Sequence, residues 1–214
     1  VWLLNPDTIV APDALTALRS MVEGNAEIGI CGSINLSYHM PTEIQARGGK
    51  SYNFWTGRVR KQSKSTIVQT PETSPPVDYI NGASMFVTRG FLETVGLMEE
   101  SYFLYFEELD WAMRSKGRFQ LGYAPGSVIY HKEGAQIGSS PDRLKRSLLA
   151  DRYLSRNRVL FTRRFVPWAL PSVMFCIVLA ATERLLRGDA RRAGVMLASM
   201  IEGLRYPKKS PEGT

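Results

Sequence analysis

The side chains best suited to chemistry begin with an aspartate that follows an apolar run. Residues 1–4 are apolar, and the turn-forming tripeptide Asn5-Pro6-Asp7 comes directly after them. A carboxylate at the end of a buried strand can hold Mg²⁺ or Mn²⁺ against phosphate oxygens, because these cations favour one or two carboxylates together with substrate phosphates. The tripeptide could equally do no more than shape a turn.

A second group of carboxylates lies near the middle of the chain. Glu107, Glu108 and Asp110 fall within four residues, directly after the aromatic run 102–106. Acidic residues in the first turn of a helix complement its dipole, which would be a purely structural role. Apolar walls and neighbouring like charges would instead raise the pKa of one carboxyl group, as suits a general base. Helical spacing puts Glu107, Asp110 and Trp111 on one face and Glu108 on another.

The third candidate is His131, at the end of a strand-like segment. Imidazole can complete the coordination of a divalent ion, although a lone histidine can also be a satisfied structural residue. His39 has no supporting context and reads as a loop residue. Since the chain has two cysteines and two histidines, a cysteine–histidine metal cluster is not expected.

Composition indicates a globular protein with an unusual distribution of charge. The 214 residues are 44% apolar and 22% charged, and the formal net charge is +7. From residue 141 onward there are 15 Lys and Arg against six Asp and Glu, whereas residues 1–140 carry 12 against 14. We therefore expect a domain over residues 1–140 and a basic helical region over residues 141–214, which could meet nucleic acid, a phosphate-bearing ligand or an anionic membrane surface.

Hydrophobic periodicity predicts an α/β fold for the first region. Strands are expected at 1–4, 28–31, 77–87, 119–124 and 127–130, and helices from Pro12 to Gly24, at 91–95 and at 107–116. Residues 35–76 are polar and read as irregular strands with a long loop. Asn81-Gly82-Ala83 interrupts the strand at 77–87, and its lack of bulk would let a ligand approach the backbone.

The basic region is expected to form three helical segments, at 143–164, 165–182 and 190–204. Residues 165–182 carry no charge and are flanked by arginines on both sides, which suits a helix lying in the headgroup region of an anionic leaflet. A buried packing helix and a membrane span remain open alternatives. Nucleic-acid binding would need aromatic residues interleaved with the basic ones on an accessible platform, whereas the arginines here accompany a long aliphatic run, so a membrane partner is preferred and nucleic acid is not expected.

Four stretches, in this order, resemble family 2 glycosyltransferases with a GT-A fold, especially bacterial rhamnosyltransferase-like members. They read LLNPDT with a following PDAL, VDYINGASMFVTRGFLETVG, YFLYFEELDWAMRSKG and YAPGSVIYH, and the later RYLSRNRVLF is similar to the segment after the catalytic domain in such proteins. Together they run from Trp2 to about Phe161. The resemblance implies a partial GT-A domain, Rossmann-like with a mixed sheet, followed by C-terminal helices.

The resemblance also implies roles for individual residues. Asp7 matches the last aspartate of the family's metal-binding Asp-x-Asp element, with Asn5 where many relatives have aspartate. Glu107 and Glu108 match the Glu-Asp motif whose second member is the catalytic base, so that Glu108 replaces an aspartate. The residues implied at the donor and acceptor pocket are Asn81, Gly82, Ala83, Asp110 and Trp111, and His131 matches a further metal ligand of some relatives.

The implied activity is inverting transfer of a sugar from a nucleoside-diphosphate donor to a cell-surface polysaccharide or lipid-linked glycan. A Mg²⁺ or Mn²⁺ ion would be the cofactor, and the enzyme would be cytoplasmic and peripheral at the inner face of the cell membrane. The family's first strands, which bind the nucleotide, have no counterpart in these 214 residues, so we expect no turnover by this stretch alone. Two alternatives are a relative that binds glycan or nucleotide sugar without chemistry, suggested by Asn5 and Glu108, and a basic peripheral membrane protein.

Overall fold

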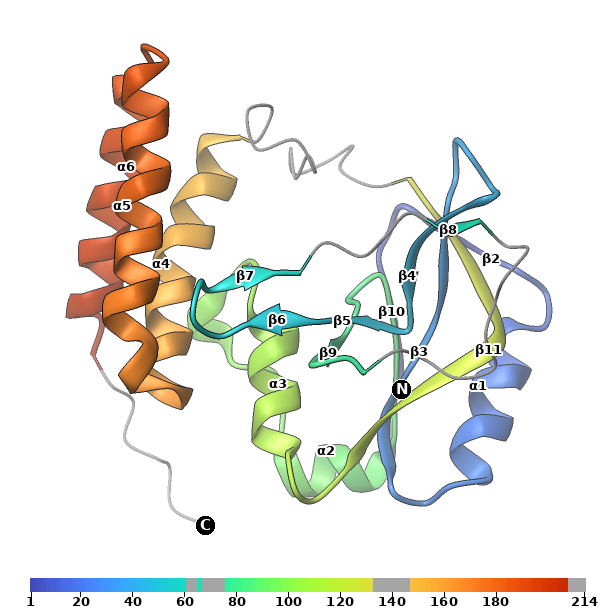
Figure 1. Ribbon diagram of the computed structural model, residues 1–214. Coiled ribbons are helices and arrows are strands. Elements are labelled where there is room, and N and C mark those ends of the chain that lie inside the picture. The colour runs from blue at the N-terminus through green and yellow to red at the C-terminus, as the bar shows by residue number, and fades with distance from the viewer. Residues whose placement is uncertain (61–64, 67–75, 133–146, 208–214) are drawn as a thin grey trace. The chain divides into compact units, whose positions relative to one another are not determined.

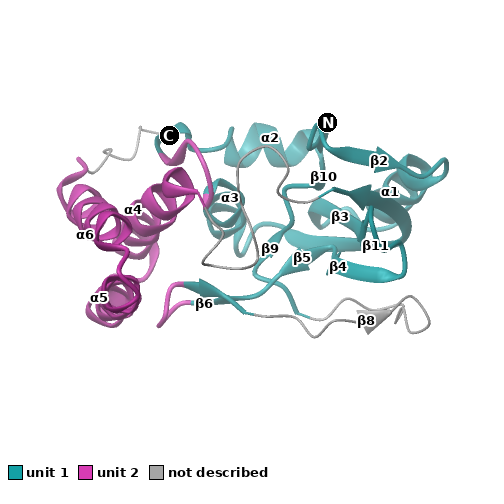
Figure 2. Cartoon of the chain, turned by 90° about the horizontal axis from the view of Figure 1, so that it is seen from above, with its two compact units in different colours: residues 1–53, 58–101, 107–140 teal, residues 54–57, 102–106, 141–214 magenta. Residues whose placement is uncertain are grey.

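A computed structural model describes residues 1–60, 65–66, 76–132 and 147–207, and these form two compact units (Figures 1 and 2). Unit 1 comprises residues 1–53, 58–101 and 107–140, and unit 2 comprises residues 54–57, 102–106 and 141–214. The main division lies at residue 140, where the charge of the sequence changes. Two short segments from the first region belong to unit 2.

Unit 1 is a mixed α/β structure around a nine-stranded sheet. Its strands are β1 (Trp2–Leu4), β2 (Thr8–Val10), β3 (Ile28–Ser37), β4 (Glu43–Arg47), β5 (Gly49–Lys50), β8 (Ser65–Thr66), β9 (Tyr79–Ile80), β10 (Ser84–Val87) and β11 (Gln120–His131). A separate hairpin joins β6 (Tyr52–Asn53) to β7 (Arg58–Val59). The helices are α1 (Ala14–Glu23), α2 (Arg89–Val95), the 3₁₀ turn η2 (Glu100–Tyr102) and α3 (Glu107–Ser115).

Strand directions bring the carboxyl ends of several strands to the same side of this sheet, which we call its carboxyl edge. The path runs β1-β10-β3-β4-β5-β9, with β11 parallel to β3 and β2 antiparallel to β11. Both β1 and β3 are antiparallel to β10. As a result β1, β3 and β11 point the same way and end at the same edge, where ligands bind in open α/β sheets.

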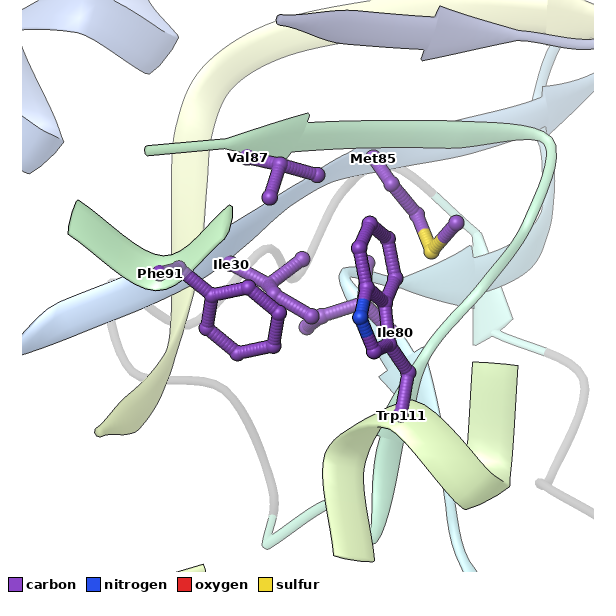
Figure 3. Close-up of a cluster of buried hydrophobic side chains, with 6 residues drawn as sticks. All are labelled: Ile30, Ile80, Met85, Val87, Phe91 and Trp111. Carbon is purple, nitrogen blue, oxygen red and sulfur yellow. The ribbon is translucent and has the colours of Figure 1, made fainter. Parts of the chain in front are cut away.

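Helices cover the two faces of the sheet because neighbouring strand residues point in opposite directions. On one face Leu18 of α1 packs against Cys31 and Ala124. On the other face, Figure 3 shows Phe91 of α2 and Trp111 of α3 against Ile30, Ile80, Met85 and Val87. Cys31 and Cys176 are both free, and burial raises the pKa of the Cys31 thiol to about 12, which leaves it a packing residue.

The structure confirms the α/β class and changes several predicted boundaries. The strand predicted at 28–31 continues to Ser37, and the strands predicted at 119–124 and 127–130 are one strand, β11, with an irregularity between Ala124 and Val128. The stretch 35–76 was predicted to form irregular strands and a long loop, and its described part contains the end of β3 and the short strands β4 to β7. We had not predicted β2. Residues 61–64, 67–75, 133–146 and 208–214 lie outside the described residues, including the predicted start of the first basic-region helix at 143.

Unit 2 consists mainly of three helices, α4 (Leu148–Phe165), α5 (Leu170–Leu186) and α6 (Ala190–Arg205), with the short 3₁₀ turn η4 (Pro167–Ala169) before α5. Val159, Val173, Ile177 and Met200 form a core shared by the three helices. Ion pairs also link α4 to α6: Arg192 bonds Asp151 at 2.9 Å, and Arg156 approaches Glu202 at 3.5 Å.

Unit 2 also holds the aromatic run that precedes α3 in a strained conformation. Phe103, Tyr105 and Phe106 have φ angles of 61°, 66° and 79°, a region that bulky residues rarely adopt. The buried amide of Asn157 donates to the carbonyl oxygens of Tyr102, Leu104 and Tyr105 at 2.8, 2.8 and 3.0 Å. The two N–H groups of this one side chain on α4 thus serve three backbone acceptors, with one N–H shared between two carbonyl oxygens, and hold the run in place.

Replacing Asn157 with alanine should therefore lower the free energy of unfolding by about 2–4 kcal/mol, because three carbonyl groups of a strained segment lose their donor. Urea denaturation measures the loss. Thr162→Val on the same helix is the control: its hydroxyl donates to Arg158 O, an acceptor that the helix backbone also uses, so about 1 kcal/mol or less is expected. Equal losses in the two variants would contradict the role assigned to Asn157.

Candidate functional site

Asp7 and His131, far apart in sequence, meet at the edge where β11 ends. His131 is paired in register with Thr8 of β2, and the Lys132 N–H donates to the Asp7 carbonyl at 3.1 Å. His131 Nε2 lies 3.3 Å from Asp7 Oδ1, and the side chains are 12% and 14% exposed. The two candidate metal ligands are thus brought together, partly sheltered yet reachable from solvent.

Gln45 on β4 orients the imidazole ring of His131. Its Nε2 donates to the His131 carbonyl at 3.2 Å, which turns its Oε1 toward His131 Nδ1 at 3.1 Å. Nδ1 is therefore the hydrogen-bond donor, and the lone pair of the neutral ring lies on Nε2, facing Asp7. Two acceptors facing each other repel, so a cation between them is favourable, and this donor set suits a divalent ion.

Asn5 connects this pair to the turn before β10. Its side-chain amide lies 3.4 Å from His131 Nε2, and its backbone N–H donates to the Ala83 carbonyl at 3.3 Å. The Asn81 side chain in turn accepts from the Ala83 N–H at 3.1 Å. Asn5, Asn81 and Ala83, all predicted pocket residues, thus line one continuous segment of the sheet edge.

Gly82 brings the same turn up against Glu108. A Cβ atom on Gly82 would collide with Glu108 Oε1, so only glycine allows this approach. Glu108 is the second residue of α3 and keeps part of its surface accessible. Two contacts therefore relate Glu108 to the Asp7–His131 pair. The Asn5 N–H donates to the Ala83 carbonyl, and Gly82 in the same turn lies against the Glu108 carboxyl group.

The surroundings of Glu108 favour its protonated form. Desolvation by burial, followed by the charge of Glu107, raises the pKa of Glu108 from its ordinary 4.5 to about 7, although its own backbone N–H and Lys50 act in the opposite direction. Tyr79, whose strand β9 pairs with β5 at Lys50, has its pKa raised by burial and then by the charge of Glu108. A carboxyl group poised near neutral pH suits proton transfer.

Asp110 and Trp111, expected near the acceptor, instead help to hold α3 on the core. Asp110 is fully buried and accepts a 2.7 Å hydrogen bond from Arg114, which also bonds the carbonyl oxygens of Val95 and Leu97. Trp111 is 2% exposed and donates from Nε1 to Gly96 O at 2.9 Å. The polar groups of both side chains have partners within the protein, so we leave the two residues out of the proposed site.

Sequence reasoning missed Gln45, Lys50 and Tyr79. Gln45 and Lys50 lie in the stretch read as irregular, and nothing in the residue types around them marks them out. Their relation to the site comes from the pairing of β4 with β3 and of β5 with β9. His39, expected to be a loop residue, is exposed in the turn after β3, edge-on to Tyr38.

Two further observations limit what the site can be. Among the described residues, no group of three or more His, Cys, Asp and Glu could hold a metal, so Asp7 and His131 would need phosphate oxygens or water to complete a coordination shell. An open cavity of about 360 Å³ lies elsewhere in unit 1 and contains no titratable side chain. It is lined by Ala17, Ser20, Met21, Gly24, Asn25, Ala124, Pro125 and Gly126.

Compared with known proteins, the chain matches no family model and shows no significant similarity to a curated protein.

The raised pKa of Glu108 predicts a pH-dependent stability. The folded protein keeps the proton on Glu108 to a higher pH than the unfolded chain does, so the free energy of unfolding should fall as pH rises from about 4.5 to about 7 and then level off. Glu108→Gln replaces the carboxyl group with an uncharged amide that does not titrate. The variant should gain roughly 1–3 kcal/mol relative to wild type across that window.

Urea denaturation in metal-free buffer at a series of pH values measures the difference. Glu93→Gln is the matched control, because Glu93 is an exposed glutamate paired with Arg89 on α2. Its curve should run parallel to that of wild type. A Glu108→Gln curve that also runs parallel to wild type would contradict the raised pKa.

Proposed function

We propose that this chain carries the metal-binding and base side of an inverting glycosyltransferase of family 2 with a GT-A fold. The donor would be a nucleoside-diphosphate sugar, and the acceptor a cell-surface polysaccharide or lipid-linked glycan. One observation carries the proposal: Asp7 and His131 lie 3.3 Å apart at the carboxyl edge of a mixed sheet, and the turn beside them touches a glutamate poised near neutral pH. The GT-A assignment is also supported by the order of the four sequence stretches.

In this proposal Asp7 Oδ1 and His131 Nε2 would hold a Mg²⁺ or Mn²⁺ ion, which offsets the charge that builds on the leaving diphosphate. Gln45 keeps the His131 ring in the tautomer that presents a lone pair. Asn5 is an additional polar group beside the imidazole. Asn81 and Gly82 are the partly exposed residues of the turn 81–83, and a sugar could lie against them.

Glu108 is the proposed catalytic base. Its carboxylate accepts the proton of an acceptor hydroxyl as that oxygen forms a bond to the anomeric carbon and the bond from this carbon to the diphosphate oxygen breaks. One displacement from the face opposite the leaving group inverts the anomeric configuration. Glu107 has a different role, since its charge raises the pKa of Glu108.

Divalent-cation binding tests the first half of the proposal without requiring turnover. Mn²⁺ should bind wild type, more tightly as pH rises, because the ion displaces any proton from His131 Nε2. Asp7→Asn and His131→Ala should each weaken binding at least tenfold, and Gln45→Ala by about 10- to 100-fold through loss of ring orientation. Electron paramagnetic resonance of free Mn²⁺ measures the affinities.

The matched controls for metal binding are Asp13→Asn and His39→Ala, whose side chains are exposed and are not proposed ligands. Both should bind Mn²⁺ as wild type does. Equal affinity in Asp7→Asn and wild type would rule out Asp7 as a ligand.

Sugar transfer by a protein that contains this chain tests the second half. Its kcat/KM should rise with pH through about 7 as Glu108 loses its proton, and Glu107→Gln should move this limb to lower pH. Glu108→Gln should reduce kcat by roughly 10²- to 10⁴-fold while Mn²⁺ binding persists. Glu93→Gln again serves as the control with unchanged turnover.

These measurements also separate catalysis from binding alone. A relative that holds nucleotide sugar without chemistry would bind donor and Mn²⁺ yet give no transfer to any acceptor, with Glu108→Gln indistinguishable from wild type. The replacement of the family's aspartates by Asn5 and Glu108 is the observation that favours this second candidate.

A further inference from the structure

Helix α5 of unit 2 exposes an apolar face that no described residue covers. Phe175 is 62% exposed and Leu186 is 83% exposed, and Trp168 in the preceding turn η4 is 66% exposed. Val178, Leu179 and Leu185 are exposed as well. Steps of three and four residues put 171, 175, 178, 179, 182, 185 and 186 on one side of a helix, and none of these positions is charged.

The opposite side of α5 is committed to the helical core. Val173, Ile177 and Ala181 are buried there, the first two against Val159 and Met200 of the neighbouring helices. Within the described residues, 167–186 is the one helical stretch long and apolar enough to cross a membrane, but its partners are rich in charge. A spanning α5 would draw the Asp151–Arg192 pair and Arg156 toward hydrocarbon, which is costly.

Arginines lie at both ends of the apolar face. Arg164 is exposed four residues before Trp168, and Arg187 and Arg191 are exposed one and five residues after Leu186, with Arg187 in an exposed ion pair with Glu183 at 2.8 Å. The basic region as a whole carries 15 Lys and Arg against six Asp and Glu. An apolar strip between cationic ends is complementary to a bilayer surface whose headgroups are negative, with the strip in the acyl boundary and the arginines at the phosphates.

We propose that the apolar face of α5, from Trp168 to Leu186, seats unit 2 on an anionic lipid surface, with α5 lying in the plane of the membrane and α4 and α6 on the aqueous side. The protein is then peripheral to a membrane and does not span it. This inference is independent of the proposed sugar transfer, since it uses none of Asp7, Glu108 or His131.

Vesicle flotation tests the surface, with phosphatidylcholine vesicles that contain or lack phosphatidylglycerol. Wild type should float with the anionic vesicles and be released by high salt. Phe175→Glu should weaken this binding by at least about tenfold, because it removes a large apolar side chain from the contact and adds a negative charge. The double change Arg187→Gln with Arg191→Gln should weaken it by about fivefold or more.

Leu97→Glu is the matched control, because Leu97 is an exposed apolar residue of unit 1 at 78% exposure and should not affect flotation. Circular dichroism checks that each variant stays folded, which is expected at exposed positions. Blue-shifted tryptophan fluorescence on binding, lost in Trp168→Phe, would locate the contact. The transfer-deficient Asp7→Asn and Glu108→Gln should float like wild type, so failure of either proposal is distinguishable from failure of the other.

Four results would overturn the proposal. One is the absence of flotation with anionic vesicles, and another is equal flotation of wild type and Phe175→Glu, as expected if the face binds a protein partner instead. The third is resistance of membrane-bound protein to alkaline carbonate extraction, which would indicate a spanning helix. The fourth is equal flotation with vesicles that contain and that lack phosphatidylglycerol, because the arginines would then make no electrostatic contribution to binding.

Discussion

Strand β11 pairs with two strands at once, parallel to β3 and antiparallel to β2, and the rest of the site depends on this double pairing. The parallel pairing brings the carboxyl ends of β3 and β11 to one edge of the sheet. Asp7 lies in the turn between β1 and β2, and the pairing of β2 with β11 places this turn beside the end of β11. Asp7 and His131 become neighbours although 124 positions separate them. Because both are held by backbone hydrogen bonds of the sheet, their geometry does not rely on a flexible loop.

The electrostatics of the edge follow from what packs around it. Gln45 uses both ends of its amide on His131, so the ring presents a lone pair to Asp7 and the pair attracts a cation. Glu108 has the opposite situation: burial and Glu107 disfavour its charge, and Gly82 leaves just enough room for its carboxyl group. The Asp7–His131 pair therefore favours a bound cation, and Glu108, which lies against the nearby turn 81–83, keeps its proton to near-neutral pH.

Much of the fold could be predicted from hydrophobic periodicity, whereas parts of the site could not. The turn at 81–83 and helix α3 follow from local residue types, but β2 has three residues and no period to detect. Ala124-Pro125-Gly126 looked like a break between strands, although β11 passes through it with an irregular register. Trp111 beside carboxylates reads the same in sequence whether it lines a pocket or fills a core, and only packing shows that it does the latter. Gln45 acquires its role from strand pairing alone.

The most direct test of the account is a crystal structure of the protein soaked with Mn²⁺ and a nucleoside diphosphate. We predict an anomalous difference peak within bonding distance of Asp7 Oδ1 and His131 Nε2, with diphosphate oxygens completing the shell and the Gln45 bond to His131 Nδ1 retained. A peak bound elsewhere, or Asp7 Oδ1 and His131 Nε2 unchanged with no ion between them at saturating Mn²⁺, would contradict the central claim.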